Sequence, residues 1–172
     1  MNEFVKALIS EGKSPLIPDD QNLYGNLVGT WDFDWYDHLE DSEPRHAKGE
    51  WIFHWILEGL AIQDIFICPS RDTRDVAPQP DAAYGTSVRM YNPQKNAWDI
   101  LYTEWGCATQ LEARRETNIF GEVIVQQVVG NDRLRWIFSD ITPDSFRWQR
   151  MALYADNTFW KMEAELIAVR RE

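Results

Sequence analysis

Three residues on neighbouring predicted strands have side chains that could orient or activate a small polar molecule. Tyr102 and Glu104 lie two positions apart in ILYTEW, and Arg89 lies on the preceding strand. A guanidinium could bind a carboxylated or enolic ligand through paired hydrogen bonds, while the tyrosine and the carboxylate could polarise a carbonyl for proton transfer. The second chemistry is that of a cofactor-independent isomerase, cyclase or hydratase. The same side chains would form a solvated polar patch if the strand register placed them outward.

Asp64 and His54 are the polar exceptions on the two faces of an apolar hairpin. Asp64 stands among aromatic residues, so its carboxyl group must be paired or protonated. A protonated Asp64 could serve as a general acid, but the pattern favours a structural ion pair with Arg89 or another cation. His54 could act as a base, although a hydrogen-bonded core histidine is favoured. The candidate catalytic residues are therefore Asp64, Glu104 and His54.

Nine tryptophans are the compositional oddity of the chain. Because an exposed indole is costly, we expect them in a core, a cavity or a subunit interface. A ligand would stack on some of these rings and be oriented by the polar residues named above. The candidate ligand-binding residues are Trp35, Trp55, Arg89, Tyr91, Tyr102, Trp148 and Arg150.

The strongest structural signal is a hairpin over residues 49–67, GEWIFHWILEGLAIQDIFI. A two-residue turn at Glu58-Gly59 would use the glycine for a positive φ and would fix the register of the two arms. One face then pairs Trp51 with Phe66, Phe53 with Asp64, Trp55 with Ile62 and Leu57 with Leu60, and the other pairs Ile52 with Ile65, His54 with Gln63 and Ile56 with Ala61. Both faces are largely apolar. We expect one to line a cavity and the other to be covered by an N-terminal helix, a loop or a second subunit; if Asp64 pointed outward, His54 and Gln63 would take its place at the cavity.

The remaining chain is predicted to be all-β after a short helix over residues 3–10, with Asn2 as its cap and Pro15 and Pro18 ending it. Further strands are expected over residues 23–35, 84–91, 97–105, 108–117, 123–129, 134–139, 146–154 and 158–169, with tight turns at Asn92-Pro93, Gly130-Asn131 and Asp156-Asn157. With the two hairpin arms, these make ten strands joined mostly by tight turns. The pattern indicates a ten-stranded antiparallel up-and-down barrel, whereas a two-sheet sandwich would need longer crossing connections.

The predicted organisation is an N-terminal helix and linker over residues 1–22 and a single barrel domain over residues 23–172. A ten-stranded barrel is wide enough to enclose a ligand. Its lining is predicted by carrying the inward face of Trp31, Phe33 and Trp35 across the ladder to Trp55, Ile62 and Asp64. The proline-rich loop after Ile67 is the candidate mouth or lid.

Charge and motifs exclude several classes of function. A net charge of −11 opposes binding to nucleic acids and anionic membrane surfaces, and no segment reaches the ~18 apolar residues of a membrane span. The two cysteines have no metal or redox spacing, so we expect free, buried thiols, no metal site and a cytoplasmic location. No HExxH motif, nucleophile elbow or phosphate-binding glycine loop is present.

The motif Gly29-Thr30-Trp31 resembles the G-x-W signature of the calycins, the lipocalin and fatty-acid-binding-protein group. In those barrels a basic residue from near the last strand covers the tryptophan, and Arg170 or Arg171 matches that position. GEWIFHWILEGLAIQD, YGTSVRMYNP, RWIFSDITPDSFRW and DNTFW resemble bacterial proteins of the DUF1579 type, over most of residues 25–170.

The resemblance implies a ten-stranded, lipocalin-like barrel with an internal cavity and carries over no catalytic residues. Nitrobindin-type haem barrels need an axial histidine near the C-terminal strands, whereas His38, His46 and His54 all lie in the first third of this chain. We therefore expect no haem or other cofactor.

The leading expectation is a barrel that binds one small hydrophobic or aromatic molecule. The alternative is a cofactor-independent enzyme acting on such a molecule, with Asp64 or Glu104 as its acid or base. A third interpretation is a homodimer that buries surplus tryptophans at its interface.

Overall fold

The computed structural model describes residues 1–154, 156 and 158–172, and its regular secondary structure is mainly β-strand. One α-helix, α1 (Glu3–Leu8), and two 3-10 helices, η1 (Asp19–Gln21) and η2 (Gly25–Leu27), precede the sheet. The strands are β1 (Gly29–Asp37), β2 (Arg45–Ile56), β3 (Ala61–Cys68), β4 (Ala83–Asn92), β5 (Ala97–Glu104), β6 (Cys107–Asn118), β7 (Gly121–Val128), β8 (Leu134–Ser139), β9 (Ser145–Tyr154) and β10 (Phe159–Arg170).

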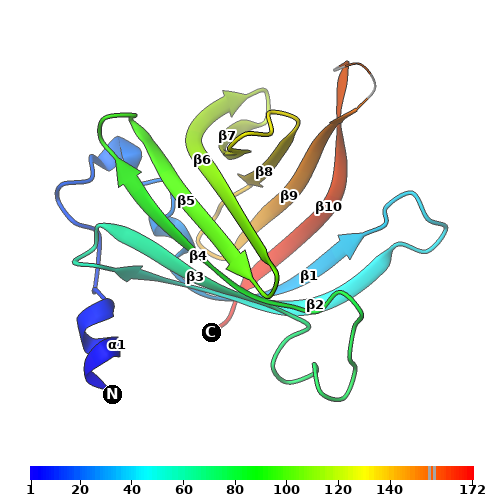
Figure 1. Ribbon diagram of the computed structural model, residues 1–172, viewed down its shortest axis with the longest axis horizontal. Helices are drawn as coiled ribbons and strands as arrows, with labels where there is room; N and C mark the ends of the chain where they lie inside the picture. The colour runs from blue at the N-terminus through cyan, green and yellow to red at the C-terminus, as the bar shows by residue number, and fades with distance from the viewer. Residues whose placement is uncertain (155, 157) are drawn as a thin grey trace.

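The strands form a closed antiparallel barrel in which each strand pairs with its sequence neighbours (Figure 1). Closure is made by β1 against β10, with Trp31 opposite Arg170 and Asp37 opposite Ala164. The prediction of a ten-stranded up-and-down barrel with a short N-terminal helix is confirmed. Because the strands alternate in direction, the connections β1–β2, β3–β4, β5–β6, β7–β8 and β9–β10 lie at one end, which we call the open end.

The hairpin formed by β2 and β3 has the predicted register throughout its ladder, from Trp51 opposite Phe66 to Ile56 opposite Ala61. Glu58 and Gly59 at the centre of its turn have φ values of 57° and 76°, as a primed turn requires. The inner face carries Asp64, so the alternative with His54 at the cavity is wrong. His54 lies exposed on the outer face and is not a core histidine.

The other strand boundaries lie close to those predicted, except for the first. Residues 23–28 are not strand: Leu27 ends η2, Tyr24 directly precedes it, and both side chains are fully buried. The register predicted from β1 to β2 is also wrong, since Trp35 lies opposite Ala47 rather than near Trp55. The predicted turn at Asp156-Asn157 includes Asn157, which lies outside the described residues.

The N-terminal segment closes the end of the barrel opposite the open end. Trp98 donates its indole N–H to the carbonyl of Gln21 at 2.9 Å, and the hydroxyl of Tyr24 donates to Oε1 of Gln126 at 3.0 Å. Asn2 caps α1 as predicted, accepting from the amide of Val5. The helix itself buries no residue and projects away from the barrel (Figure 1). The plug is therefore formed by residues 17–27 rather than by the helix.

Arg170 performs the role that the resemblance assigned to Arg170 or Arg171. Its guanidinium carbon lies 4.1 Å from the ring centroid of Trp31, which is fully buried and donates its N–H to the carbonyl of Leu27. Arg170 also donates to the carbonyls of Val28 and Asn26. It thus ties the last strand to the segment that plugs the closed end.

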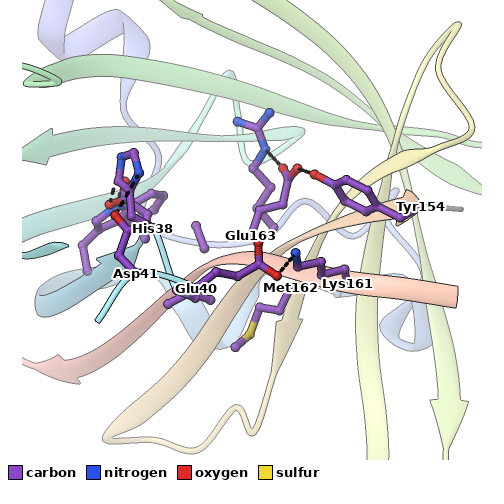
Figure 2. A pocket seen from close by; sticks show the side chains of 12 residues that line it. His38, Glu40, Asp41, Tyr154, Lys161, Met162 and Glu163 are labelled. Atoms are coloured by element: carbon purple, nitrogen blue, oxygen red, sulfur yellow. Dashed lines mark hydrogen bonds and ion pairs between the residues drawn. The ribbon is translucent and has the colours of Figure 1, made fainter. Parts of the chain in front are cut away.

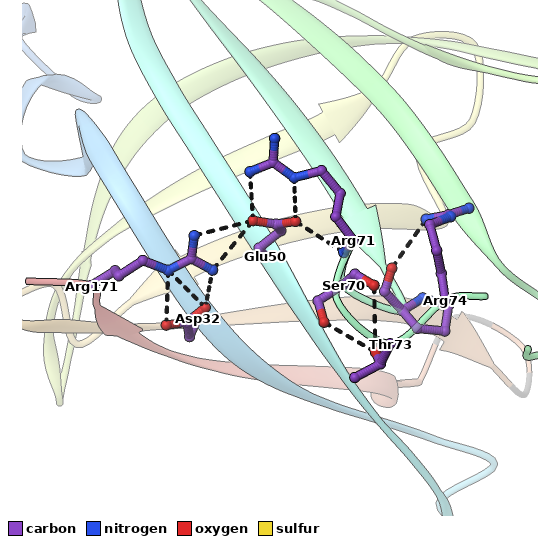
Figure 3. Close-up of polar contacts among 8 residues, drawn as sticks. Asp32, Glu50, Ser70, Arg71, Thr73, Arg74 and Arg171 are labelled. Carbon is purple, nitrogen blue, oxygen red and sulfur yellow. Dashed lines mark hydrogen bonds and ion pairs between the residues drawn. The ribbon is translucent and has the colours of Figure 1, made fainter. Parts of the chain in front are cut away.

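The loop between β3 and β4 is anchored to the outside of the barrel. Glu50, only 2% exposed, accepts hydrogen bonds from the amide and the guanidinium of Arg71 and from Arg171, which also pairs with Asp32 (Figure 3). Most of this loop therefore covers the outer face of β2, and only its end near Asp81 borders the open end.

Cys68 is buried, but Cys107 is exposed, so the prediction of two buried thiols is wrong for Cys107. No helix among the described residues is long and apolar enough to cross a membrane.

Candidate ligand-binding cavity

A cavity of about 420 Å³ enters the barrel from the open end. Residues from β1, β2, β3, β4, β5, β6, β8 and β9 line it, so it lies within the closed sheet rather than on one side of it. This volume falls within the range of about 300–1,000 Å³ that is usual for small-molecule sites. We call it the interior cavity.

Six aromatic side chains form a continuous wall around the interior cavity. Neighbouring ring centroids lie 5.2–6.0 Å apart along the series Tyr102, Trp136, Trp148, Trp35, Phe66 and Trp51. Each residue points inward because it occupies an inward position in the two-residue alternation of its strand. These six residues are the aromatic wall.

The indole N–H groups of Trp51, Trp136 and Trp148 are buried and have no hydrogen-bond partner among the described residues. A buried donor without a partner costs about 1–3 kcal/mol. In contrast, the N–H of Trp35 donates to Asp37 at 2.9 Å. Half of the aromatic wall therefore has unused hydrogen-bonding capacity.

The floor of the interior cavity is a buried ion pair between Asp64 and Arg89, which are 0% and 2% exposed. Asp64 also accepts from the amide of Ser87 at 3.0 Å, and Arg89 donates Nε–H to Gln126 at 3.3 Å. The Arg89 guanidinium lies over the rings of Tyr24, Phe53 and Phe138, 5.0–5.9 Å from their centroids. The predicted interpretation of Asp64 as one half of a structural ion pair is confirmed.

Tyr24 completes the polar layer beneath this floor. Burial raises the pKa of its phenol far above the ordinary value, and the nearby Arg89 opposes the shift only in part. The neutral phenol is therefore favoured, and in this form Tyr24 donates to Gln126. The layer separates the interior cavity from the plugged end of the barrel.

Tyr102 and Glu104 lie together on the wall near the open end. Burial, and after it the negative charge of Glu104, raise the pKa of Tyr102 far above the ordinary value. The phenol is therefore a hydrogen-bond donor and not a base. Gly85 on β4 makes room for it: a Cβ there would lie 2.7 Å from the Tyr102 hydroxyl oxygen.

Two arginines at the mouth of the cavity are held by carboxylates. Arg45 forms a two-pronged ion pair with Asp37 and a longer one, 3.6 Å, with Asp81. Burial acts to raise the pKa of Asp37, but hydrogen bonds from Arg45 and Trp35 outweigh it and hold that pKa below its ordinary value. Arg150 pairs with Glu163 at 2.9 Å.

A second, more open pocket of about 360 Å³ lies on the rim beside Trp35 and Arg150. Figure 2 shows its polar side chains, with Lys161 reaching Glu40, and Tyr154 donating to Glu163 at 2.5 Å. Its charged groups are paired with one another, and Trp35 and Arg150 border both pockets. This rim pocket extends the mouth of the interior cavity.

The structure brings together six of the predicted site residues, all bordering the interior cavity: Trp35, Arg89, Tyr102, Glu104, Trp148 and Arg150. Asp64 lies directly beneath them, bonded to Arg89. Trp55 and Tyr91 face inward but lie below the floor. Trp55 contacts the N-terminal segment, and Tyr91 packs on Trp98 and donates to Asn96. Alternation along a strand determines which face a residue occupies but not how deep in the barrel it lies. For this reason Trp55 and Tyr91 were predicted on the correct face but do not border the interior cavity.

His54 lies on the opposite face of β2, where its Nδ1 is 2.8 Å from the carbonyl oxygen of Trp55. None of the three histidines borders the interior cavity. Among the described residues, no group of three or more His, Cys, Asp or Glu side chains could hold a metal ion.

The sequence did not single out three members of the aromatic wall, Trp51, Phe66 and Trp136, as ligand-binding residues. The hairpin register already placed Trp51 and Phe66 on the face of Asp64, so that signal was present. Trp136 lies in RWIF on β8 opposite Arg150, and only the pairing of β8 with β9 relates the two.

Comparison with known proteins adds information about the fold. No family model and no curated protein matches the chain. The barrel is similar to the crystal structure of Rv2717c from M. tuberculosis, with a TM-score of 0.60 over 91% of this chain and 99% of that chain, at 10% sequence identity. The likeness is one of fold. It agrees with the barrel that the calycin resemblance implied, while membership of the calycin or DUF1579 group stays a prediction.

Proposed function

We propose that this protein binds one small, largely apolar or aromatic molecule in the interior cavity. The observation that carries the proposal is a space of about 420 Å³ bordered by six aromatic rings and open at one end of a barrel whose other end is plugged. Small barrels normally fill their interiors with side chains, so an unfilled aromatic chamber indicates a site for a ligand.

The aromatic wall supplies the binding energy and the polar groups set the orientation. Ring stacking is worth about 0.5–1.5 kcal/mol per pair beyond the area buried. Acceptor atoms on the ligand could satisfy the unpaired indole donors of Trp51, Trp136 and Trp148. Tyr102 offers a further donor close to the mouth.

Isothermal titration against a panel of one-ring and two-ring aromatic compounds tests this proposal. Replacing Trp148 by Ala should weaken binding about tenfold or more, because a stacking surface is lost. Trp105→Ala is the matched control, since Trp105 is fully exposed at the β5–β6 turn. Equal losses in the two variants, or no saturable binding by any compound, would contradict the proposal.

Tyr102 and Glu104 favour a second candidate function, a cofactor-independent isomerase, cyclase or hydratase. A protonated Tyr102 could polarise a substrate carbonyl while Glu104 accepts a proton from the neighbouring carbon. Asp64 is not used here, because Arg89 and the Ser87 amide already engage its carboxylate. Turnover of a bound compound that is lost in Tyr102→Phe while binding persists would support catalysis; binding without turnover would support a binding protein.

The homodimer stays a prediction. Exposed apolar residues at the turns, notably Trp105, Ile119 and Phe120, are available for such a contact. Sedimentation equilibrium at micromolar concentration would detect it, and a monomer there would exclude a stable dimer.

A further inference from the structure

Every arginine that borders the interior cavity is already neutralised. Arg89 pairs with Asp64, Arg45 pairs with Asp37 and Asp81, and Arg150 pairs with Glu163. Within the described part of the chain, no lysine or histidine borders this cavity. An anionic ligand would therefore meet no free cation, and it would have to compete with a carboxylate for each guanidinium.

Glu104 is the opposite case. It borders the interior cavity, is partly buried, and takes part in no ion pair with any residue that the structure describes. Its neighbour on the same face of β5 is Tyr102, whose phenol is neutral and therefore supplies no compensating charge. Among the described residues, Glu104 is therefore the carboxylate of the cavity lining that no cation neutralises.

The aromatic wall begins next to this carboxylate. Tyr102 packs edge-on against Trp136 at 5.5 Å, and Trp136 against Trp148 at 5.7 Å. Aromatic ring faces attract cations by about 0.5–1 kcal/mol when exposed and about 2 kcal/mol or more when desolvated. A carboxylate beside several aromatic rings is an arrangement suited to an ammonium group or another organic cation.

We propose that the ligand of the interior cavity is a small organic cation, such as an aromatic amine, whose charged group is bound by Glu104 and whose rings lie against Trp136 and Trp148. The inference rests on the proposed function and adds the sign of the ligand's charge. It replaces the expectation of a carboxylated or enolic ligand, because that expectation assumed a free Arg89. The net charge of −11 would also favour the approach of cations over anions.

The unpaired indole donors are compatible with this inference. They require acceptor atoms, which an amine ligand can carry on its ring system, and they contribute no net charge. The preference for a cationic ligand therefore rests on Glu104 and the neutralised arginines. The indole donors concern only the uncharged part of the ligand, its ring system.

Three probes of similar size and different charge separate the possibilities: tryptamine, the neutral 3-methylindole and indole-3-propionate. Titration should show tryptamine binding about tenfold or more tightly than 3-methylindole, with indole-3-propionate weakest. Glu104→Gln should remove the preference for tryptamine over 3-methylindole. Glu122→Gln is the control, because it removes the same charge from a residue outside the interior cavity.

The outcomes distinguish the two proposals. If 3-methylindole binds but tryptamine is no tighter, or if the preference survives in Glu104→Gln, the charge inference is overturned and the cavity proposal stands. If none of the three probes nor any compound of the wider aromatic panel binds, both are overturned. Retained binding of 3-methylindole in Glu104→Gln also shows that this variant is folded.

Discussion

Asp64 and Arg89 form a fully buried ion pair between two adjacent strands, with the Arg89 guanidinium enclosed by three aromatic rings. The pair separates the interior cavity from the plugged end of the barrel. Its carboxylate accepts from the Ser87 amide as well, and its guanidinium donates to Gln126. Asp64 is therefore part of the structure that holds the site, rather than a group free to exchange protons.

Replacing Asp64 by Asn should destabilise the protein strongly. The substitution leaves the Arg89 charge buried without its carboxylate, which typically costs about 3–5 kcal/mol. Urea unfolding followed by tryptophan fluorescence measures the change in the free energy of unfolding. The double variant Asp64→Leu with Arg89→Met should recover much of the loss, because an apolar pair removes the uncompensated charge; a double variant as unstable as Asp64→Asn would argue against this account.

Gly85→Ala should disturb the wall of the cavity. The added methyl would lie 2.7 Å from the Tyr102 hydroxyl oxygen and 3.0 Å from the carbonyl oxygen of Thr103. We expect a loss of about 1–3 kcal/mol and weaker ligand binding, since Tyr102 must move. Gly12→Ala serves as the control because its added methyl meets nothing within 4 Å. Unchanged binding in Gly85→Ala would show that the position of Tyr102 does not matter to the site.

The stability of the barrel should fall in acid partly through Glu50. Hydrogen bonds from Arg71 outweigh burial and hold the pKa of Glu50 at about 2, against an ordinary value of 4.5. Because the folded-state pKa is depressed, this contribution is complete above about pH 4.5 and is lost as the pH falls toward 2. Glu50→Gln should therefore cost about 1–3 kcal/mol near pH 6 and progressively less in acid.

Urea unfolding of both proteins across this pH range measures the difference. Glu122→Gln, which changes an exposed carboxylate, should alter the free energy of unfolding by less than about 0.5 kcal/mol. A difference between wild type and Glu50→Gln that stays constant with pH would contradict the assignment.

Arg170→Lys should show whether the cover over Trp31 depends on the shape of the guanidinium. Arg170 stacks on the indole and donates to three carbonyl groups, those of Val28, Asn26 and Pro143. Lysine keeps the charge but not the planar set of donors, so we expect a loss of about 1–2 kcal/mol, and a larger one in Arg170→Ala. If the lysine variant were as stable as wild type, the positive charge of Arg170, and not the planar shape of its guanidinium, would account for the contact with Trp31.

The sequence predicted the barrel well because tight turns and two-residue alternation are local signals. The hairpin of β2 and β3 is the best case: one glycine at the turn fixed every pairing along it, including that of Phe53 with Asp64. A resemblance of three residues predicted that Arg170 or Arg171 covers Trp31, and the structure shows Arg170 there, although the two partners lie at opposite ends of the chain.

The predictions of residue positions were wrong where they depended on how deep a residue lies in the barrel or on the register between strands that no tight turn connects. Trp55 and Tyr91 occupy inward positions but lie near the plugged end, and no local pattern distinguishes them from Trp51 or Tyr102. The register of β1 against β2 passes through a seven-residue connection (38–44) with no fixed turn type, so Trp35 could not be paired correctly. Likewise, the neutralisation of the arginines depends on cross-strand pairs such as Arg150 on β9 with Glu163 on β10, where an irregularity between Met162 and Ala164 shifts the register.

The most direct test of the cavity proposal uses the nine tryptophan indole N–H signals in nitrogen-15-correlated NMR spectra. Titration with 3-methylindole and the wider aromatic panel should shift the signals of the wall residues Trp35, Trp51, Trp136 and Trp148. It should leave Trp105 at the exposed turn and Trp98 beside the plug unchanged. Shifts confined to Trp105, or no saturable shift with any compound, would contradict a ligand site inside the barrel.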